Sequence, residues 1–383
     1  MSQSQTYSLG RLTSYFLKLG TTGFGGPVAL VGYMHRDLVE KKKWIAEDDY
    51  KEGLALAQLA PGPLAAQLAI YLGYVHHKIL GATIAGLAFV IPSFLMVVGL
   101  GMAYVHFGGI SWMQDVFYGV SASVIGIIAI SGYKLTTKSI GKDWLLWIIF
   151  VGAGAVTVIT ESENVLLFIA AGILFWFVKA PPKFKNASAP TILLLPLASV
   201  FVFSSDVNVL EKIALFFTKA GAFVFGSGLA IVPFLYSGVV KENHWLTDQQ
   251  FIDAVAVAMI TPGPVVITVG FIGYLIAGFP GACVAALATF LPCYLFTVIP
   301  APYFKKYGKN KGLKAFVDGV TAAAIGAIVG AVIILGRRTL IDVPTIILAV
   351  STAGILFATK KIPEPVIVLV AALLGFTIKH FSN

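Results

Sequence analysis

The sequence predicts an all-α polytopic membrane protein made of two homologous halves, and three observations carry that prediction. Of its 383 residues, 58% are hydrophobic and only 12% are charged, whereas soluble domains have roughly a quarter charged. The apolar runs are continuous rather than alternating, which indicates membrane helices and not a barrel. The chain also repeats itself after about 200 residues.

The repeat is centred on a tetrapeptide that interrupts a long apolar run. Ala60-Pro61-Gly62-Pro63 recurs as Thr261-Pro262-Gly263-Pro264, and Trp44 recurs 201 residues later as Trp245. After one deleted residue the offset becomes 200, with matched pairs at Gly73 and Gly273, Gly81 and Gly281, Pro92 and Pro292, Gly119 and Gly319, and Gly126 and Gly326. Interrupted apolar segments at matching positions of two halves are typical of a transporter's binding site. The alternative is that the prolines and glycines only help helices to pack.

Thirteen apolar runs equal or approach the length of about 20 residues that a membrane-crossing helix needs. They are expected at 11–35, 54–75, 80–106, 115–136, 144–160, 164–179, 190–204, 209–240, 254–277, 281–303, 315–336, 343–359 and 363–381. This predicts an N-terminal repeat at 1–188, a connecting transmembrane segment at 189–208 and a C-terminal repeat at 209–383, with six segments in each repeat.

Thirteen crossings would insert the two repeats upside down relative to each other, and we expect such inverted repeats. With the N-terminus inside, 17 lysines and arginines fall in inside loops and 8 in outside loops, in agreement with the positive-inside rule. If both PGP segments are re-entrant hairpins, there are eleven crossings and parallel halves, and the numbers become 16 and 9. Charge therefore does not separate broken, crossing PGP helices from re-entrant ones.

Several classes of protein are excluded or disfavoured. The N-terminus lacks the features of a signal peptide, so the first transmembrane segment must direct insertion. Cys283 and Cys293 lie in one apolar stretch and are expected to be packed thiols rather than a disulfide. The net charge of +9 lies mainly in short loops, which favours contact with anionic lipid and not with nucleic acid. The sequence contains no metal-site spacing, nucleotide fingerprint or nucleophile elbow, so neither a cofactor nor an enzyme is expected. The oligomeric state stays open, with a homodimer as one option.

The two PGP segments can form an anion site. Each removes two amide donors, so one helix must end there and another begin. The new helix presents unpaired N–H groups and the positive end of its dipole, which together attract anions. The expected substrate-binding residues are those of the two breaks and the two polar residues that follow them, Pro61, Gly62, Pro63, Gln67, Pro262, Gly263, Pro264 and Thr268. Alternatively, Gln67 and Thr268 only bridge helices.

A glycine-rich loop lies one segment before the PGP segment in both halves and is a second candidate for anion binding. Its permissive backbone can present several N–H groups to a ligand, through the residues Gly25, Gly26, Gly226, Ser227 and Gly228. Lys18 and Lys219 precede the two loops in otherwise apolar helices, where two cations would complete an anion trap. The alternatives are close helix packing for the glycines and snorkelling to the interface for the lysines.

Coupling to protons would require a titratable group in the pathway. The candidates are four carboxylates near the starts of apolar runs, Glu52, Asp115, Asp253 and Asp318. Glu52 and Asp253 are repeat partners at the mouths of the two PGP segments. The ordinary alternative is that all four cap helix starts.

These residues resemble a known family. Phe24-Gly25-Gly26-Pro27, the run from Ala57 to Gln67 and Pro92 are similar to the first half of a chromate ion transporter. The runs from Phe225 to Pro233 and from Ile260 to Val266 resemble the second domain of its long form. The resemblance implies an inner-membrane secondary transporter that exports chromate, driven by the proton gradient or membrane potential, with sulfate as a competitor. Two alternatives are uptake or exchange of sulfate or a related oxyanion, and a membrane-embedded reductase.

Overall fold

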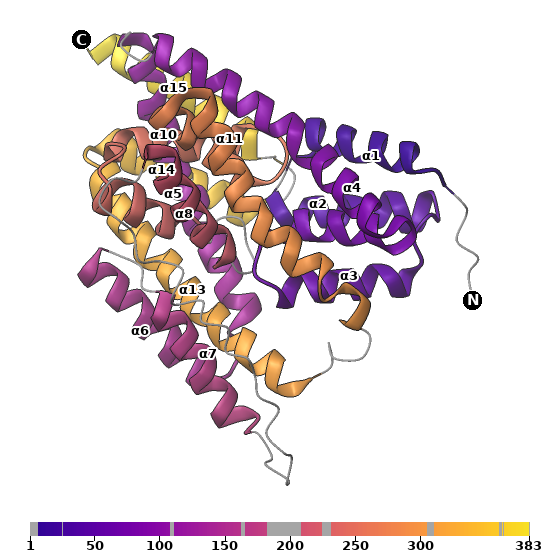
Figure 1. Ribbon diagram of the computed structural model, residues 1–383. Coiled ribbons are helices and arrows are strands. Elements are labelled where there is room, and N and C mark those ends of the chain that lie inside the picture. The colour runs from indigo at the N-terminus through magenta and orange to yellow at the C-terminus, as the bar shows by residue number, and fades with distance from the viewer. Residues whose placement is uncertain are drawn as a thin grey trace.

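The described part of the computed structural model is all-helical (Figure 1). It covers residues 7–24, 26–107, 111–161, 165–181, 208–223, 231–304, 310–359, 362 and 364–382. The predicted connecting segment at 189–208 lies outside this part, except for Asn208.

The helices of the two halves follow one another in the same order. The first half contains α1 (Leu9–Thr22), α2 (Gly26–Met34), the π-helical turn η1 (His35–Lys41), α3 (Glu47–Leu59), α4 (Leu64–Phe107), α5 (Ser111–Ser139), α6 (Trp144–Thr160) and α7 (Val165–Lys179). The second half contains α8 (Val209–Ala222), α9 (Ile231–Tyr236), η4 (Ser237–Glu242), α10 (Asp248–Ile260), η5 (Val265–Ile267), α11 (Thr268–Val298), η6 (Ala301–Tyr303), α13 (Lys311–Thr339), α14 (Val343–Ala358) and α15 (Glu364–Ser382).

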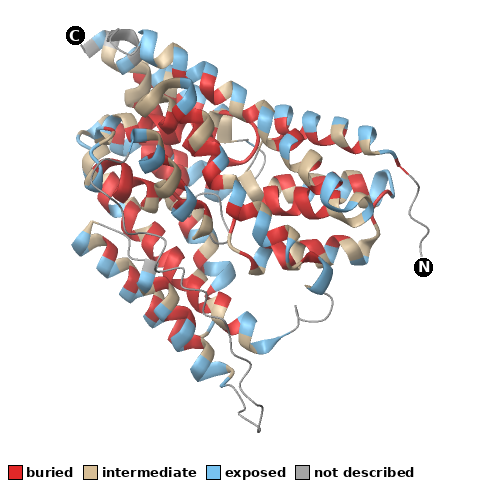
Figure 2. Cartoon of the chain, in the orientation of Figure 1, coloured by how far each residue is buried: buried red, intermediate tan, exposed pale blue. Residues whose placement is uncertain are grey.

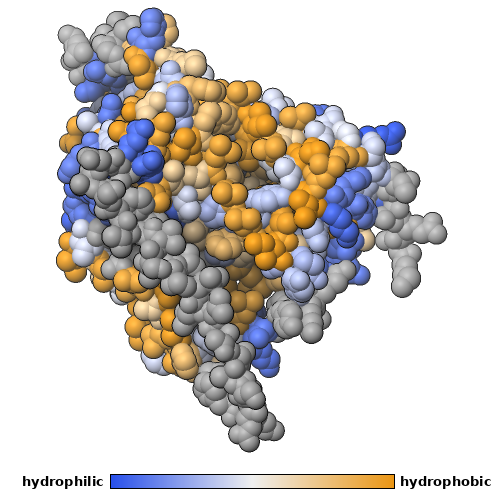
Figure 3. Space-filling model, in the orientation of Figure 1, coloured by the Kyte–Doolittle hydropathy of each residue, from blue (hydrophilic) through white to orange (hydrophobic). Residues whose placement is uncertain are grey.

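The chain is a multi-pass membrane protein by the length and apolar character of these helices. Four stretches of the described part are long and apolar enough to cross a bilayer, namely Leu64–Phe107, Gln114–Ser139, Val265–Tyr303 and Lys311–Thr339. Apolar side chains cover much of the surface seen in Figure 3. Large ones such as Ile159, Leu166 and Leu373 are more than half exposed, as lipid-facing residues would be. Figure 2 shows buried residues where α6 and α7 face α13.

The expected boundaries of several runs were wrong. The run 11–35 divides at Gly23 between α1 and α2, the run 54–75 divides between α3 and α4, and 254–277 divides among α10, η5 and α11. The run 209–240 contains both α8 and α9. Hydropathy registers composition alone, whereas the breaks are set by prolines without amide donors and by glycines. The resulting pieces of 13 or 14 residues are about 20 Å long, which is short of a bilayer's apolar core.

Both α4 and α11 reverse direction inside their labelled length. Lys78 has φ 52° and ψ −141°, and Ala277 and Gly278 are the equivalent non-helical residues of α11. A Cβ on Gly73 would lie 2.3 Å from the Gly81 carbonyl oxygen. The repeat partners Gly273 and Gly281 make the same approach, at 2.4 Å. These duplicated glycines are therefore needed because two arms of a tight helical hairpin touch through their backbones.

The two PGP segments are also the turns of helical hairpins. Nine residues before Gly62, a Cβ on Gly53 would lie 2.2 Å from the ring of Tyr71, which follows Gly62 by nine residues. In the second half the hydroxyl of Thr268 donates to the carbonyl of Ala254 at 2.8 Å. The helices before and after each break therefore lie side by side.

The two halves exchange their last helices. In the first half α6 and α7 pack on α13 of the second half, while α14 and α15 pack on α5 of the first. A Cβ on Gly119 of α5 would lie 1.9 Å from the carbonyl oxygen of Ala371 in α15. Its partner Gly319 would meet the carbonyl oxygen of Ala171 in α7 at 2.6 Å. The repeated glycines of these helices therefore serve close packing between the halves.

The equivalent helices α5 and α13 lie antiparallel. Gly132 of α5 faces Ile328 and Val329 of α13, whereas Ile125, one turn or more earlier in α5, faces Gly336, later in α13. As one helix is followed forward, its contacts therefore run backward along the other. A pseudo-two-fold axis that relates α5 to α13 would therefore run perpendicular to the two helices.

Candidate functional site

The two PGP breaks form the centre of the candidate site. In the first half α3 ends at Leu59 and α4 begins at Leu64, and in the second α10 ends at Ile260 before η5 begins at Val265. Both central glycines have a positive φ, +141° for Gly62 and +99° for Gly263. Residues with a Cβ rarely adopt such angles. Both glycines are buried. The expectation that each PGP ends one helix and starts another is confirmed.

Each break packs against the long helix of the other half. A Cβ on Gly263 would lie 1.9 Å from the Ser93 hydroxyl oxygen of α4, and one on Gly62 would lie 3.2 Å from the Cys293 sulfur of α11. Ser93 and Cys293 are repeat partners, 200 residues apart, and both are fully buried. Each break therefore contacts the long helix of the other half through one of two equivalent residues.

Sequence reasoning missed Ser93 and treated Cys293 only as a packed thiol. A signal was present, because each directly follows a member of the matched pair Pro92 and Pro292. The hydroxyl of Ser93 donates to the carbonyl of Gly20 at the end of α1, at 3.1 Å. The end of α1, the long helix α4 and the second break are joined through this side chain.

The two breaks differ in how fully their polar groups are paired. The amide N–H of Gly263 donates to the carbonyl of Gly23 at 2.9 Å, and Thr268 is paired with Ala254. In the first break the Gln67 side-chain nitrogen donates to the carbonyl of Pro61 at 2.7 Å. The Gln67 carbonyl oxygen has no partner in the described part of the chain. The first break therefore keeps an open acceptor, and the second has none at the equivalent position.

The structure does not bring the two predicted lysines into the site. Lys18 and Lys219 are exposed, on the faces of α1 and α8 that point away from the core. The glycines two residues later, Gly20 and Gly221, approach the backbones of Phe89 and Thr289 at 2.4 and 2.1 Å, measured from a Cβ placed on each. Among the predicted loop residues, Gly26 has φ +71°. Gly25, Gly226, Ser227 and Gly228 lie outside the described residues.

Of the four predicted carboxylates, Asp253 is the one buried in the protein, with 2% exposure. Its two oxygens accept hydrogen bonds from Tyr104 of α4 at 2.8 Å and from Gln249 at 2.7 Å. Gln249 also donates to Ser121 of α5. Asp253 therefore links α10 of the second half to two helices of the first.

The other three carboxylates lie in less enclosed positions. Glu52 is half-buried beside Tyr71 of α4. Asp115 is half-buried near the start of α5, and Asp318 is half-buried in the second turn of α13.

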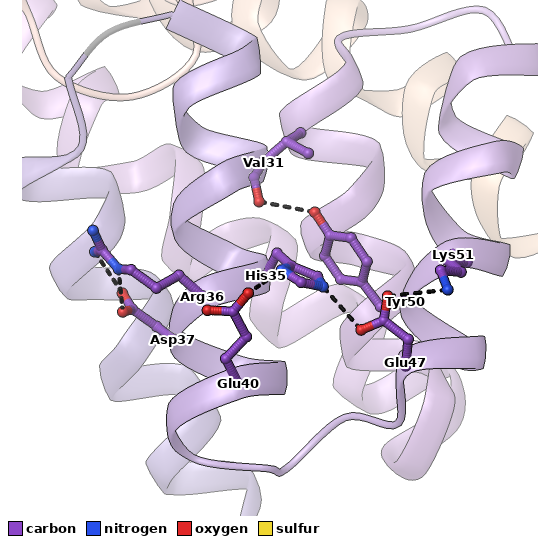
Figure 4. A network of polar contacts seen from close by, with 8 residues as sticks. All are labelled: Val31, His35, Arg36, Asp37, Glu40, Glu47, Tyr50 and Lys51. Atoms are coloured by element: carbon purple, nitrogen blue, oxygen red, sulfur yellow. Dashed lines mark hydrogen bonds and ion pairs between the residues drawn. The ribbon is translucent and has the colours of Figure 1, made fainter.

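A polar contact fixes the first arm of each PGP hairpin. His35 of η1 lies between two carboxylates, with Nδ1 3.1 Å from Glu40 and Nε2 2.9 Å from Glu47 at the start of α3 (Figure 4). The hydrogen bond with His35, together with Lys51, holds the pKa of Glu47 below its usual value. In the second half Tyr236 replaces His35 and donates to Asp248 at 2.6 Å. The equivalent hairpin arm is thus held by an imidazole in one half and by a phenol in the other.

An ion cluster ties the second hairpin to both halves. Glu161, in the turn after α6, accepts from Lys241 at 2.6 Å and from Arg338 of α13 at 2.7 Å. Arg338 also bonds to Asp248 at the start of α10. The hydrogen bond from Lys241 lowers the pKa of Glu161, and the charge of Arg338 acts in the same direction. No group of three metal-ligating side chains occurs among the described residues.

Duplicated halves, long apolar helices and a buried broken-helix site define this chain as a multi-pass membrane transporter. It belongs to the chromate transporter family, whose model matches residues 10–176 and again residues 211–376. The chain is 70% identical to the chromate transport protein of Cupriavidus metallidurans, over 97% of this chain and 93% of that protein.

Two further relatives extend the comparison. The probable chromate transport protein of Synechococcus elongatus is 62% identical, over 96% of this chain and 95% of its own length. The chromate transport protein of Pseudomonas aeruginosa is 30% identical over 97% of this chain and 92% of its own length. No solved structure matches the chain. Membership of a transporter family sets the chain apart from the enzymes considered from the sequence.

Proposed function

We propose that this protein is a secondary transporter that exports chromate across the bacterial inner membrane. The observation that carries the proposal is the pair of buried PGP breaks, each packed on the long helix of the other half. A helix that starts at such a break offers unpaired N–H groups to an anion. The relatives that match nearly the whole chain are named for chromate transport, which supports chromate as the substrate.

Sulfate is the expected competitor of chromate. Both are tetrahedral oxyanions of similar size, so a site lined only by donors would separate them weakly. Uptake or exchange of sulfate is the second candidate function, because the N–H groups at the start of a helix attract the ionised oxygens of either anion. A test is uptake of labelled chromate and sulfate into everted membrane vesicles. Export predicts energised accumulation of chromate inside them, and energised accumulation in right-side-out vesicles alone would contradict export.

The two halves are proposed to be inverted repeats. The antiparallel packing of the equivalent helices α5 and α13 supports this orientation, because a two-fold axis across such helices turns one half upside down. The hairpin geometry of the PGP segments supports a re-entrant path for them. This path is compatible with inverted halves, because the runs 11–35 and 209–240 also divide into short helices and the count of eleven crossings no longer applies. Cysteine labels in loops 36–50 and 76–79 test the path. In a re-entrant hairpin, α3 and the first arm of α4 enter and leave the membrane on one side. The labels should then react from the same side.

Asp253 is the proposed proton-coupling residue. It is buried, and its hydrogen bonds from Tyr104 and Gln249 span both halves. A change in its charge would therefore alter contacts between the halves, which a coupled transporter requires. Lys18 and Lys219 are proposed to snorkel to the membrane interface, since both are exposed.

A further inference from the structure

The Gln67 amide carries an unpaired acceptor in the centre of the candidate site. Its nitrogen donates to the carbonyl of Pro61 at 2.7 Å, and that carbonyl can only accept, so the amide cannot be turned the other way. The side-chain oxygen is left without a donor in the described part of the chain, and Gln67 has 0% exposure. A buried acceptor with no partner is costly and rare in native proteins.

This side chain folds back over the first break. A Cβ on Gly62 would lie 2.7 Å from the Gln67 nitrogen and 2.8 Å from its Cδ. Behind Gly62, α4 begins at Leu64, and the backbone N–H groups of Leu64, Ala65 and Ala66 have no partner inside the helix. The N–H of Gln67 donates to the carbonyl of Pro63. All of these residues are buried. The break therefore combines backbone donors with one side-chain acceptor on buried residues.

The second break does not offer this combination in the described part. Its Gly263 amide is bound to Gly23, and the Thr268 hydroxyl at the position of Gln67 is bound to Ala254. The first break is therefore the position at which a ligand would bind, and we call Gly62, Gln67 and the start of α4 the seat. A fully ionised oxyanion has only acceptors, so it would satisfy the donors of α4 and leave the Gln67 oxygen unpaired.

We propose that the seat at the first break binds the singly protonated oxyanion, hydrogen chromate, whose O–H donates to the Gln67 side-chain oxygen. Its ionised oxygens face the N–H groups at the start of α4. The inference rests on the proposed function and names the protonation state of its substrate. The second acid dissociation of chromate lies near neutral pH, whereas sulfate and selenate lose their last proton at far lower pH. A site built to pair a substrate hydroxyl rejects an analogue that lacks it.

Equilibrium binding to the full-length protein in lipid nanodiscs tests this without a proton gradient. Chromate and selenate are titrated at fixed ionic strength, from one pH unit below to two units above the second dissociation of chromate. Above that point we expect the apparent affinity for total chromate to fall about tenfold per pH unit, in proportion to its protonated fraction. Selenate should bind weakly at every pH, because a lost acceptor pairing corresponds to about 5- to 150-fold in affinity.

Selenate also controls for titration of the protein. The titratable groups on the elements packed here include Cys293 of α11, whose sulfur lies 3.2 Å from a Cβ placed on Gly62, Tyr71 of α4 and Glu52 of α3. The same elements also carry Glu47, Asp48, Asp49, Tyr50, Lys51, Tyr74, His76, His77, Lys78, Tyr104, His106, Tyr274, Cys283 and Tyr294. The chromate dianion and selenate carry the same charge, so titration of a protein group would change the affinity for both in parallel. A parallel fall in both affinities would therefore overturn the proposal. So would equal binding of both anions at neutral pH, or chromate binding that depends on sodium or potassium and not on pH. If chromate binds at no pH, the proposed function itself fails.

A variant removes the Gln67 amide, and with it both the unpaired acceptor and the hydrogen bond that the side-chain nitrogen donates to Pro61. Gln67→Met is unbranched and of similar length, and it should bind chromate and selenate alike, with no pH dependence for chromate. Thr297→Val is the matched control, since that buried hydroxyl donates within its own helix to the carbonyl of Cys293. The control should keep the preference for chromate. Retention of the full preference by Gln67→Met would overturn the role of Gln67, and the wild-type pH series stands if the variant does not fold.

Discussion

The contact between Gly263 and Ser93 gives a prediction whose size can be worked out from the structure. In Gly263→Ala the new Cβ would lie 1.9 Å from the Ser93 hydroxyl oxygen and 3.0 Å from its Cβ. The backbone also has φ +99° there, which costs a residue with a Cβ about 1–3 kcal/mol. Overpacking in a close-packed site adds about 1–3 kcal/mol. We therefore expect a loss of about 2–6 kcal/mol in the free energy of unfolding.

A double variant separates the two contributions. Ser93→Ala removes the closest atom and should cost about 0.5–1.5 kcal/mol by itself, because its hydrogen bond to Gly20 is lost. In Ser93→Ala with Gly263→Ala the clash is relieved while the backbone strain remains. The double variant should therefore be more stable than the sum of the single effects by about 1–3 kcal/mol.

The assay is unfolding in mixed detergent, followed by tryptophan fluorescence, with chromate transport measured on the same preparations. Gly99→Ala is the matched control, since Gly99 is exposed on the same helix as Ser93 and nothing lies within 4 Å of its added Cβ. It should gain about 0.5–1 kcal/mol. If Gly263→Ala is as stable as Gly99→Ala, or the double variant shows no coupling, the second break does not pack on α4 as described.

Three further predictions concern charged residues. Asp253→Asn keeps the shape and should abolish chromate transport driven by a pH gradient while chromate–chromate exchange continues; gradient-driven transport at the normal rate would remove Asp253 from coupling. Lys18→Ala with Lys219→Ala should keep most of its chromate transport in everted vesicles, and loss of transport in correctly inserted protein would return these lysines to the anion site. The pKa of Glu161 is lowered in the folded state, so its stabilisation is present above the unfolded pKa and is lost as pH falls through the folded pKa. Thermal unfolding measured against pH should give Glu161→Gln a free energy of unfolding about 0.2–1 kcal/mol below that of wild type at neutral pH, a size that solvent screening limits. After acidification the two proteins should be equally stable.

The sequence predicted the breaks because their cause is local. Prolines without donors and a glycine between them end a helix wherever they occur, and repetition 201 residues later marks the pattern as structural. The partner of each break could not be predicted, since Ser93 lies 170 residues from Gly263. The duplicated glycines indicated close packing but not which backbone approaches. The partner of each break lies on the long helix of the other half, and a contact between residues so far apart leaves no periodic trace in the chain.

The two lysines lie on exposed faces for a different physical reason. A lysine in an apolar run is costly only if its side chain points into the protein or the lipid centre. The face of the helix decides this, and the faces of α1 and α8 are set by the glycines that touch α4 and α11. Gly20 and Gly221 turn those faces inward, so the lysines two residues earlier point outward. Hydropathy counts alone contain no such information.

The unequal pairing of the two breaks follows from their different partners. The second break is tied through Gly263 to Gly23 and rests on the hydroxyl of Ser93, so its polar groups are used within the protein. At the equivalent place the first break meets the thiol of Cys293, and the Gln67 oxygen has no partner in the described part of the chain. One break is then suited to hold the halves together and the other to bind a ligand. The breaks also differ at the equivalent positions 67 and 268, because Gln67 carries an amide oxygen without a partner in the described part of the chain, whereas the Thr268 hydroxyl donates to Ala254.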